Sequence, residues 1–190
     1  DLVRSVRKGK FKYIRNYQPF NVDGLYNFYR YKMLAYKEWY NLFQNGKLNE
    51  VQSQFFKPKT PEALYNIEED PHETNNLAND DNYNETLTGL RNELNNHLIS
   101  INDLSFLPEP HLLQNGLDDI VDYSEKNKDL IKSLIEISDL MLYDYNEVSS
   151  KIKDALNNDN PWVRYWGLIV SSTFGDLALE NNEKINFIFE

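Results

Sequence analysis

Cysteine is absent from the sequence, which excludes disulfide bonds, thiolate metal sites and cysteine nucleophiles. Long apolar runs are also missing. None approaches the roughly 20 residues that a membrane-spanning helix requires, so we expect no membrane partner. The chain begins at Asp1 without an initiator methionine, a signal peptide or a lipidation motif, and we therefore expect a mature or excised piece of a longer protein. These residues do not identify a cellular compartment.

The chain does contain enough apolar and aromatic side chains for a core. Its 190 residues are 41% hydrophobic and 14% aromatic, which suits one large domain or two small ones and excludes a disordered tail. The net charge is −10, so a nucleic-acid partner is not expected. Residues 1–61 nevertheless carry 12 Lys and Arg against 4 Asp and Glu. This basic third could face an anionic substrate or an acidic neighbouring domain, or its cations could simply be solvated.

The amino-terminal part of the chain predicts a small antiparallel sheet. Extended runs over 2–7 and 10–15 flank Lys8-Gly9 and together predict a β-hairpin, with glycine available for the positive φ of a tight turn. Residues 63–67 predict a third strand. Because an isolated hairpin is marginally stable in water, these strands need a further layer to cover them.

Helices are predicted around the third strand. One long helix is expected over 26–45, ended by Gly46, and a short one over 49–56. The long helix is rich in aromatic rings, which at helical spacing usually pack in a core, with carbohydrate stacking as the alternative. A further helix over 82–99 carries a leucine stripe that would cover the sheet. The stripe consists of Leu87, Leu90, Leu94 and Leu98.

The remainder of the chain predicts an all-helical zone. Two prolines within 105–110 indicate a linker or a crossing segment, and we expect one domain over 1–105 and another over 106–190. The run Asn160-Pro161-Trp162-Val163-Arg164 places an N-cap and a first-turn proline together, and it resembles the loop that opens the second helix of a HEAT-type repeat. The expected fold class is α+β, a small antiparallel sheet packed by helices and followed by an all-helical HEAT-like extension. Further helices are expected over 117–124, 129–142, 146–156 and 161–173, and the apolar end, 187–190, indicates an array cut inside a repeat.

No self-contained catalytic motif is present. The sequence lacks a glycine-rich phosphate loop, a His-Glu-x-x-His pair and a Gly-x-Ser-x-Gly elbow. The three histidines lie in separate elements without metal-ligand spacing. Adjacent carboxylates point in different directions on a helix and make a poor metal clamp. We therefore expect no catalytic residue and no metal site in this chain.

The most distinctive pattern of the chain lies over 62–78. It is Glu62-Ala63-Leu64-Tyr65-Asn66-Ile67-Glu68-Glu69-Asp70-Pro71-His72-Glu73-Thr74-Asn75-Asn76-Leu77-Ala78. This run closely resembles the carboxy-terminal signature of the type I sulfatases, of the alkaline-phosphatase-like superfamily, which is Glu-x-Leu-Tyr-Asp-Leu followed by Asp-Pro-x-Glu-x-x-Asn-Leu. Asn66 stands where Asp is usual. The preceding hairpin is similar to the one in that family, and the helical zone resembles an extension of bacterial heparan N-sulfatase-like members.

The resemblance implies a non-catalytic fragment of an enzyme that hydrolyses sulfate esters or N-sulfates on sulfated glycans. In this family a formylglycine, made within a Cys/Ser-x-Pro-x-Arg motif, and calcium act in a larger amino-terminal domain, and that motif is absent here. The expected partners are therefore that missing domain and a sulfated carbohydrate, and the longer protein would be periplasmic or secreted. Cations at the rim of the substrate site would suit a polyanionic sugar. The candidates are Arg7, Lys12, Arg15, Arg30 and His72, each of which could instead be solvated or contact the missing domain.

A second hypothesis is a stand-alone interaction module whose HEAT-like helices bind a protein. The reading frame upstream of Asp1 separates the two. A Cys/Ser-x-Pro-x-Arg motif a few hundred residues upstream would decide for the sulfatase fragment, whereas a gene that ends just upstream would favour the module.

Overall fold

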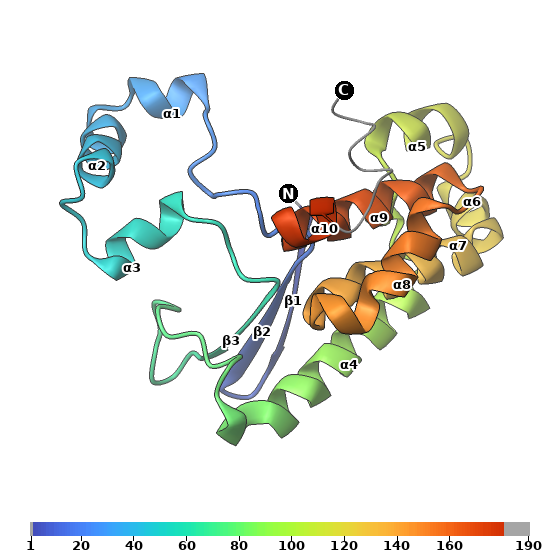
Figure 1. Cartoon of the computed structure of the whole chain (residues 1–190), viewed down its shortest axis with the longest axis horizontal. Helices are drawn as coiled ribbons and strands as arrows, with labels where there is room; N and C mark the ends of the chain where they lie inside the picture. Colours follow the sequence, from blue (N-terminus) through green and yellow to red (C-terminus); the bar gives the residue numbers. More distant parts are fainter. Residues whose placement is uncertain (1, 181–190) are drawn as a thin grey trace.

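The computed structural model describes residues 2–180 and contains a small sheet, helices on one of its faces and a projecting helical lobe (Figure 1). Strands β1 (Val3–Lys8), β2 (Phe11–Asn16) and β3 (Glu62–Asn66) form an antiparallel sheet in the order β1-β2-β3. The predicted hairpin and third strand are confirmed. The register pairs Lys8 with Phe11, so the two turn residues are Gly9 and Lys10 and not Lys8 and Gly9. Gly9 has a φ of 58°, a conformation that favours glycine.

Helix α4 (Asn84–Ser100) covers one face of this sheet, as the leucine stripe predicts. All four leucines of the stripe are buried, and they join Tyr13 of β2 and Leu64 of β3 in one hydrophobic cluster. Burying a leucine side chain stabilises the fold by roughly 1.5–3 kcal/mol. The stripe therefore fixes both the position of α4 and which face of the sheet it covers.

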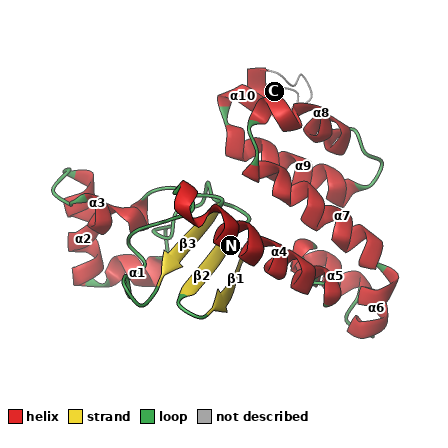
Figure 2. Ribbon diagram, turned by 90° about the horizontal axis from the view of Figure 1, so that it is seen from below, coloured by secondary structure: helices red, strands yellow, loops and turns green. Residues whose placement is uncertain are grey.

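The helices after α4 continue the same core. Ile131 and Leu134 of α7 and Trp166 of α9 belong to the cluster that contains Tyr13, and a smaller cluster fills the space between α8 and α9. Figure 2 shows these helices on one side of the sheet and the segment over 24–57, which contains α1 to α3, on the other side. The boundary at 105/106 stays a prediction. The elements are α5 (Glu109–Asn115), α6 (Ile120–Lys126), α7 (Lys128–Ser138), α8 (Tyr145–Leu156), α9 (Pro161–Phe174) and α10 (Asp176–Glu180).

The segment over 105–110 packs on the core, which fits the crossing segment and not the linker among the two predicted alternatives. Phe106 is 1% exposed, and its carbonyl oxygen accepts a hydrogen bond of 2.7 Å from the indole Nε1 of Trp166. Helix α5 begins at Glu109 with Pro110 in its first turn, where a missing N–H removes no helical hydrogen bond. The two prolines therefore lie at the start of α5, next to a segment that is packed in the core. The apolar end at 187–190 lies outside the described residues.

The chain over 24–57, here called the aromatic lobe, leaves the sheet after β2 and returns before β3 (Figure 1). It contains α1 (Phe28–Lys32), α2 (Leu34–Gln44), α3 (Glu50–Ser53) and a 3₁₀ turn (Gln54–Phe56). The single helix predicted over 26–45 is wrong, because Met33 is extended, with a ψ of 123°, and separates α1 from α2. Gly46 follows α2 with a φ of 64°, as predicted for its end.

The rings of the aromatic lobe pack on one another and not on the sheet. The ring centroids of Trp39 and Phe55 lie 4.8 Å apart, and those of Phe43 and Phe56 also lie 4.8 Å apart. Of the rings between 24 and 57, only those of Tyr36 and Phe56 are buried. The prediction that most of these rings lie in the core is therefore wrong, because the lobe points away from the sheet and has too few residues to enclose them.

Candidate interaction surface

The two faces of the sheet have different surroundings. Side chains alternate along a strand, so Val6, Tyr13 and Leu64 face α4 and are packed in the core. The opposite face carries Ser5 and Arg7 of β1, Lys12 and Ile14 of β2 and Tyr65 of β3, and we call it the open sheet face. Ser5 and Arg7 are exposed there.

Two of the cations predicted for the substrate rim meet on the open sheet face. Arg7 lies directly opposite Lys12, and Lys12 lies directly opposite Tyr65, so the three side chains form one row across the sheet. The Lys12 Nζ lies 2.7 and 2.9 Å from the carboxylate oxygens of Glu73. Arg7 donates through Nε to the carbonyl oxygen of Gly9 at 3.3 Å and is otherwise open to solvent. Arg7 is therefore the more available of the two cations.

Asp70 stabilises the turn that places Glu73 next to Lys12 in this row. Its carboxylate accepts backbone N–H groups from Thr74 at 2.7 Å and Asn75 at 2.8 Å, and the Thr74 hydroxyl at 3.1 Å. The Asn75 N–H, with the two Thr74 donors, holds the pKa of Asp70 below its ordinary value. Glu73 has a φ of 55°, which few residues other than glycine adopt. The turn leaves His72 exposed beside Glu73.

Asn76 and Leu77 protect the outer edge of β3. The Asn76 Oδ1 accepts the backbone N–H groups of Leu64 at 2.9 Å and Ala78 at 3.0 Å, and the Leu77 N–H donates to the Leu64 carbonyl at 2.8 Å. These bonds occupy backbone groups that an edge strand would otherwise present to solvent. Each polar residue of the Asp-Pro-x-Glu-x-x-Asn-Leu pattern therefore has a structural partner in the sheet or its turn.

The other two candidate cations lie elsewhere. Arg15 is on the covered face and 0% exposed, where its guanidinium donates to backbone carbonyls. Arg30 is in α1 and donates through Nη1 to the Asp23 carbonyl at 2.7 Å. Its guanidinium also lies 5.5 Å from the ring centroids of Tyr36 and Phe55. The structure thus brings Arg7, Lys12 and the turn of His72 together and separates Arg15 and Arg30 from them.

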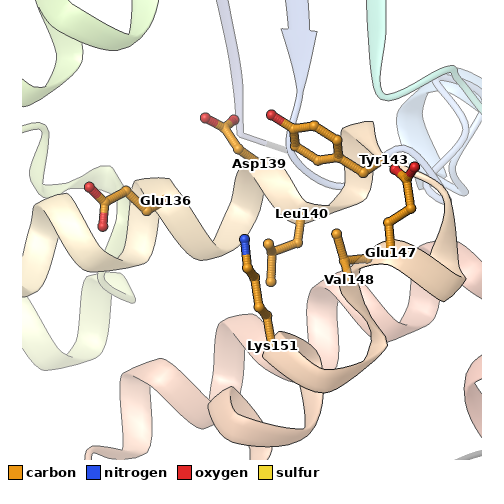
Figure 3. A pocket seen from close by; sticks show the side chains of 7 residues that line it. All are labelled: Glu136, Asp139, Leu140, Tyr143, Glu147, Val148 and Lys151. Carbon is orange, nitrogen blue, oxygen red and sulfur yellow. The ribbon is translucent and has the colours of Figure 1, made fainter.

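A pocket of about 370 Å³ lies between the end of α7 and α8 (Figure 3). Three carboxylates and one ammonium group line it, and burial raises the pKa of Asp139, against the opposing effect of Arg15. No motif in the sequence indicates this pocket, because its residues come from α7, the 3₁₀ turn after it (Asp139–Leu142), the following Tyr143 and α8. Its lining is Glu136, Asp139, Leu140, Tyr143, Glu147, Val148 and Lys151.

Over residues 2–180, no group of three or more His, Asp and Glu side chains is placed to hold a metal ion. In the same residues no helix combines the length and apolar character needed to span a membrane. The calcium and formylglycine that the sulfatase resemblance implies remain predictions for another domain. The chemistry available on the open sheet face is the binding of anions by Arg7 and of protein or sugar surfaces by its mixed polar and apolar row.

Comparison with known proteins relates the chain to a sulfatase. The relative is the ulvan-active sulfatase of Formosa agariphila, which is 42% identical over 114 residues, or 60% of this chain. The matched region is 19% of that relative, so this chain covers only a small part of the length of the protein it matches. No family model matches the chain. The relationship to sulfatases is thus confirmed, and the heparan N-sulfatase-like and HEAT-like details stay predictions.

Proposed function

We propose that this chain is a non-catalytic, carboxy-terminal part of a sulfatase whose catalytic residues lie elsewhere in a longer polypeptide. The observation that carries this proposal is the 42% identity to a sulfatase over a region that is 19% of that enzyme. The structural roles of Asp70, Glu73 and Asn76 support it, because they account for the signature pattern without any catalytic step.

The longer protein would hydrolyse sulfate esters or N-sulfates on a sulfated glycan. A formylglycine and calcium in the other domain would supply the nucleophile and stabilise the charge on the sulfate. The matched relative is named for activity on ulvan, and the excess of Lys and Arg over residues 1–61 suits a polyanionic carbohydrate. The helical extension packs behind the sheet and would support it, with the α8–α9 pair as the HEAT-like unit.

The open sheet face is the part of this chain that we assign to the rim of the substrate site. Arg7 would bind a sulfate group there, because its guanidinium is exposed and has no carboxylate partner among the described ion pairs. Lys12 is held by Glu73 and would position the signature turn. His72, exposed on that turn, would extend the same rim.

The test begins with the reading frame that contains this chain. We expect it to encode a Cys/Ser-x-Pro-x-Arg motif upstream, and we expect the full-length product to hydrolyse an aryl sulfate in the presence of calcium. The 190-residue chain alone is expected to give no turnover under the same conditions. Turnover by a clean preparation of the chain alone would overturn the proposal, and a frame without the motif would favour a stand-alone interaction module.

A variant of the full-length protein tests the rim. Arg7→Met is expected to raise KM for a sulfated oligosaccharide by roughly tenfold, about 1.4 kcal/mol of lost binding, with little change for a small aryl sulfate. Lys128→Met, at the start of α7 on the far side of the sheet, is the matched control and should change neither constant. An unchanged KM for the Arg7 variant would exclude Arg7 from the substrate rim.

A further inference from the structure

The aromatic lobe exposes a run of large apolar side chains. Leu34 is 84% exposed, Tyr29 is 80% exposed and Tyr26 is 73% exposed, although each is large enough to stabilise a core. Monomeric soluble proteins rarely expose contiguous apolar patches larger than a few hundred Å², and larger patches mark interaction sites. The run, here called the α1 face, consists of Leu25, Tyr26, Phe28, Tyr29, Met33 and Leu34.

Nothing in the described part of this chain covers the α1 face. The Gln54 side chain of the aromatic lobe donates to the Thr74 carbonyl of the remainder. The two segments that lead into and out of the lobe are joined by the Lys59 N–H, which donates to the Pro19 carbonyl. Both views place α1 on the far side of the sheet from α7–α9 (Figures 1 and 2). The surface that covers the α1 face must therefore be supplied by other residues.

The composition of the α1 face favours a protein surface over a carbohydrate. Leu25, Met33 and Leu34 are aliphatic and offer no flat ring on which a sugar could stack. Aromatic residues, Met and Arg are enriched in protein interfaces, whereas Asp and Glu are depleted from them. No Asp or Glu occurs between Leu25 and Lys37.

The cations of α1 lie against aromatic rings of the lobe and stay accessible to solvent, Lys32 more than Arg30. The Lys32 Nζ lies 4.1 Å from the ring centroid of Phe28, and the Arg30 guanidinium lies over two rings and donates to backbone carbonyls. Such cation–π contacts hold the charges at the edge of the apolar run. Each cation can therefore form an ion pair with a carboxylate at the edge of an apolar protein surface. A sulfate needs several donors around it, and two cations held against separate rings do not provide them.

We propose that the α1 face is the docking surface for the catalytic domain of the same polypeptide. This inference rests on the proposed function, in which that domain occupies the part of the sulfatase that this chain lacks. The aligned region is 19% of the matched relative, so most of that protein lies outside the alignment and could cover the α1 face. The complementary surface is apolar, with acidic side chains at its rim to meet Arg30 and Lys32.

Hydrogen exchange measured by mass spectrometry tests the contact in the full-length protein. We expect amides over 25–36 to exchange at least about tenfold more slowly in the full-length protein than in the 190-residue chain. Peptides over 117–126 are the internal control, because they also expose apolar side chains, including Val121 at 70%, and should exchange equally in both. Protection of α2 in the chain alone shows that the lobe is folded in that sample.

A matched pair of substitutions in the full-length protein completes the test. Leu34→Asp is expected to return exchange over 25–36 to the rate of the chain alone, whereas Val121→Asp should leave it unchanged. Equal exchange over 25–36 in the two proteins, in a frame that encodes a catalytic domain, overturns the inference and leaves the proposed function intact. Slowing in the chain alone on addition of a sulfated oligosaccharide, or with rising chain concentration, also overturns it, in favour of a glycan or a second copy. A frame without a catalytic domain overturns the proposed function and the inference with it.

Discussion

The guanidinium of Arg15 donates through Nη2 to the carbonyl oxygen of Ser138, at 2.8 Å, across 123 positions of the sequence. Its Nη1 donates to the carbonyls of Pro61 at 2.8 Å and Asn16 at 3.0 Å. Arg15 also lies 3.5 Å from the carboxylate of Asp139, and its guanidinium carbon is 4.7 Å from the ring centroid of Tyr17. One buried cation thus ties β2, the start of β3 and the end of α7 together.

Replacing Arg15 is expected to cost considerable stability. Arg15→Met keeps the length of the side chain but removes the guanidinium hydrogen bonds to three backbone carbonyls, of which that of Pro61 keeps a second donor, the Asn16 N–H. We expect the free energy of unfolding to fall by roughly 3 kcal/mol. Urea denaturation followed by circular dichroism measures this. Arg7→Met replaces an exposed side chain on the neighbouring strand β1, and it should change the free energy of unfolding by less than about 0.5 kcal/mol. A loss below about 1 kcal/mol for the Arg15 variant would show that water replaces the guanidinium.

Glu62 makes a second polar connection between the sheet and α4. Its carboxylate accepts from Arg91 at 2.6 and 2.9 Å and from the Tyr13 hydroxyl at 2.9 Å. Burial, together with the charge of Glu62, raises the pKa of Tyr13 far above its ordinary value, so the hydroxyl remains a donor. Glu62→Gln is expected to lower the free energy of unfolding by about 2 kcal/mol, because the charged Arg91 then faces a neutral amide with a single acceptor oxygen in place of a bidentate carboxylate.

The exposed pair of Lys8 and Glu93 is the control for that measurement. Its atoms lie 2.8 Å apart, but the side chains are 71% and 46% exposed, and surface pairs contribute little. Lys8→Met should therefore change the unfolding midpoint in urea much less than Glu62→Gln. Equal shifts would mean that the Glu62 pair is screened by water as the surface pair is.

The elements with strong periodicity could be predicted from the sequence. The spacing of Leu87, Leu90, Leu94 and Leu98 predicts both α4 and its buried face. The hairpin is predicted too, but its register is not, because the turn lies at Gly9-Lys10 and not at Lys8-Gly9. The break at Met33 could not be predicted, because neither glycine nor proline marks it. It is set by ring packing across the break, where the ring centroids of Tyr31 and Tyr40 lie 5.3 Å apart.

The candidate site was partly predictable for the same reason. Strand alternation places Arg7 and Lys12 on one face and Arg15 on the other, so the register alone separates these cations. The pairing of Lys12 with Glu73 depends on the conformation of the turn after β3, and the burial of Phe106 depends on Trp166, 60 positions away. Contacts of that range leave no local signal in the sequence.

The Arg4–Asp103 contact predicts an acid-sensitive component of stability. Asp103 lies 2.7 and 3.1 Å from donors of Arg4 and accepts the Ser105 N–H at 3.0 Å. Burial alone would raise the pKa of Asp103, but the hydrogen bonds from Arg4 and Ser105 outweigh it and hold the pKa below its ordinary value of 3.8. The ionised group therefore contributes stability above its unfolded pKa, and this is lost as the pH falls through the lower folded pKa.

Asp103→Asn should remove that component. The variant is expected to be less stable than the wild type at neutral pH, and the difference should shrink below about pH 4, when measured as urea midpoints across a pH series. Asp139 contributes with the opposite sign, since burial raises its pKa and its contribution is lost as the pH rises. A difference between Asp103→Asn and the wild type that stays constant down to about pH 2 would show that the charge of Asp103 is not what stabilises the contact.

Asn66 occupies the position of the sulfatase signature where Asp is usual, and the structure gives it an unusual environment. Its side chain is 3% exposed on β3, and neither its Nδ2 nor its Oδ1 has a hydrogen-bond partner among the described residues. A buried polar group without a partner costs about 1–3 kcal/mol, whereas an apolar group of similar size does not. Asn66→Leu is therefore expected to raise the free energy of unfolding of this chain by about 1 kcal/mol.

Two further variants at this position distinguish the polar cost from packing. Asn66→Ala removes the amide but leaves a cavity, so it should gain less than Asn66→Leu or lose stability. Asn66→Asp places a carboxylate in the same environment, and its stability should fall as the pH rises through the elevated pKa that burial imposes on such a group. Urea midpoints of the three variants at two pH values are sufficient. A loss of more than about 1 kcal/mol for Asn66→Leu would contradict the expected gain, and would mean either that the Asn66 amide has a hydrogen-bond partner in solution or that the site is too closely packed for a leucine side chain.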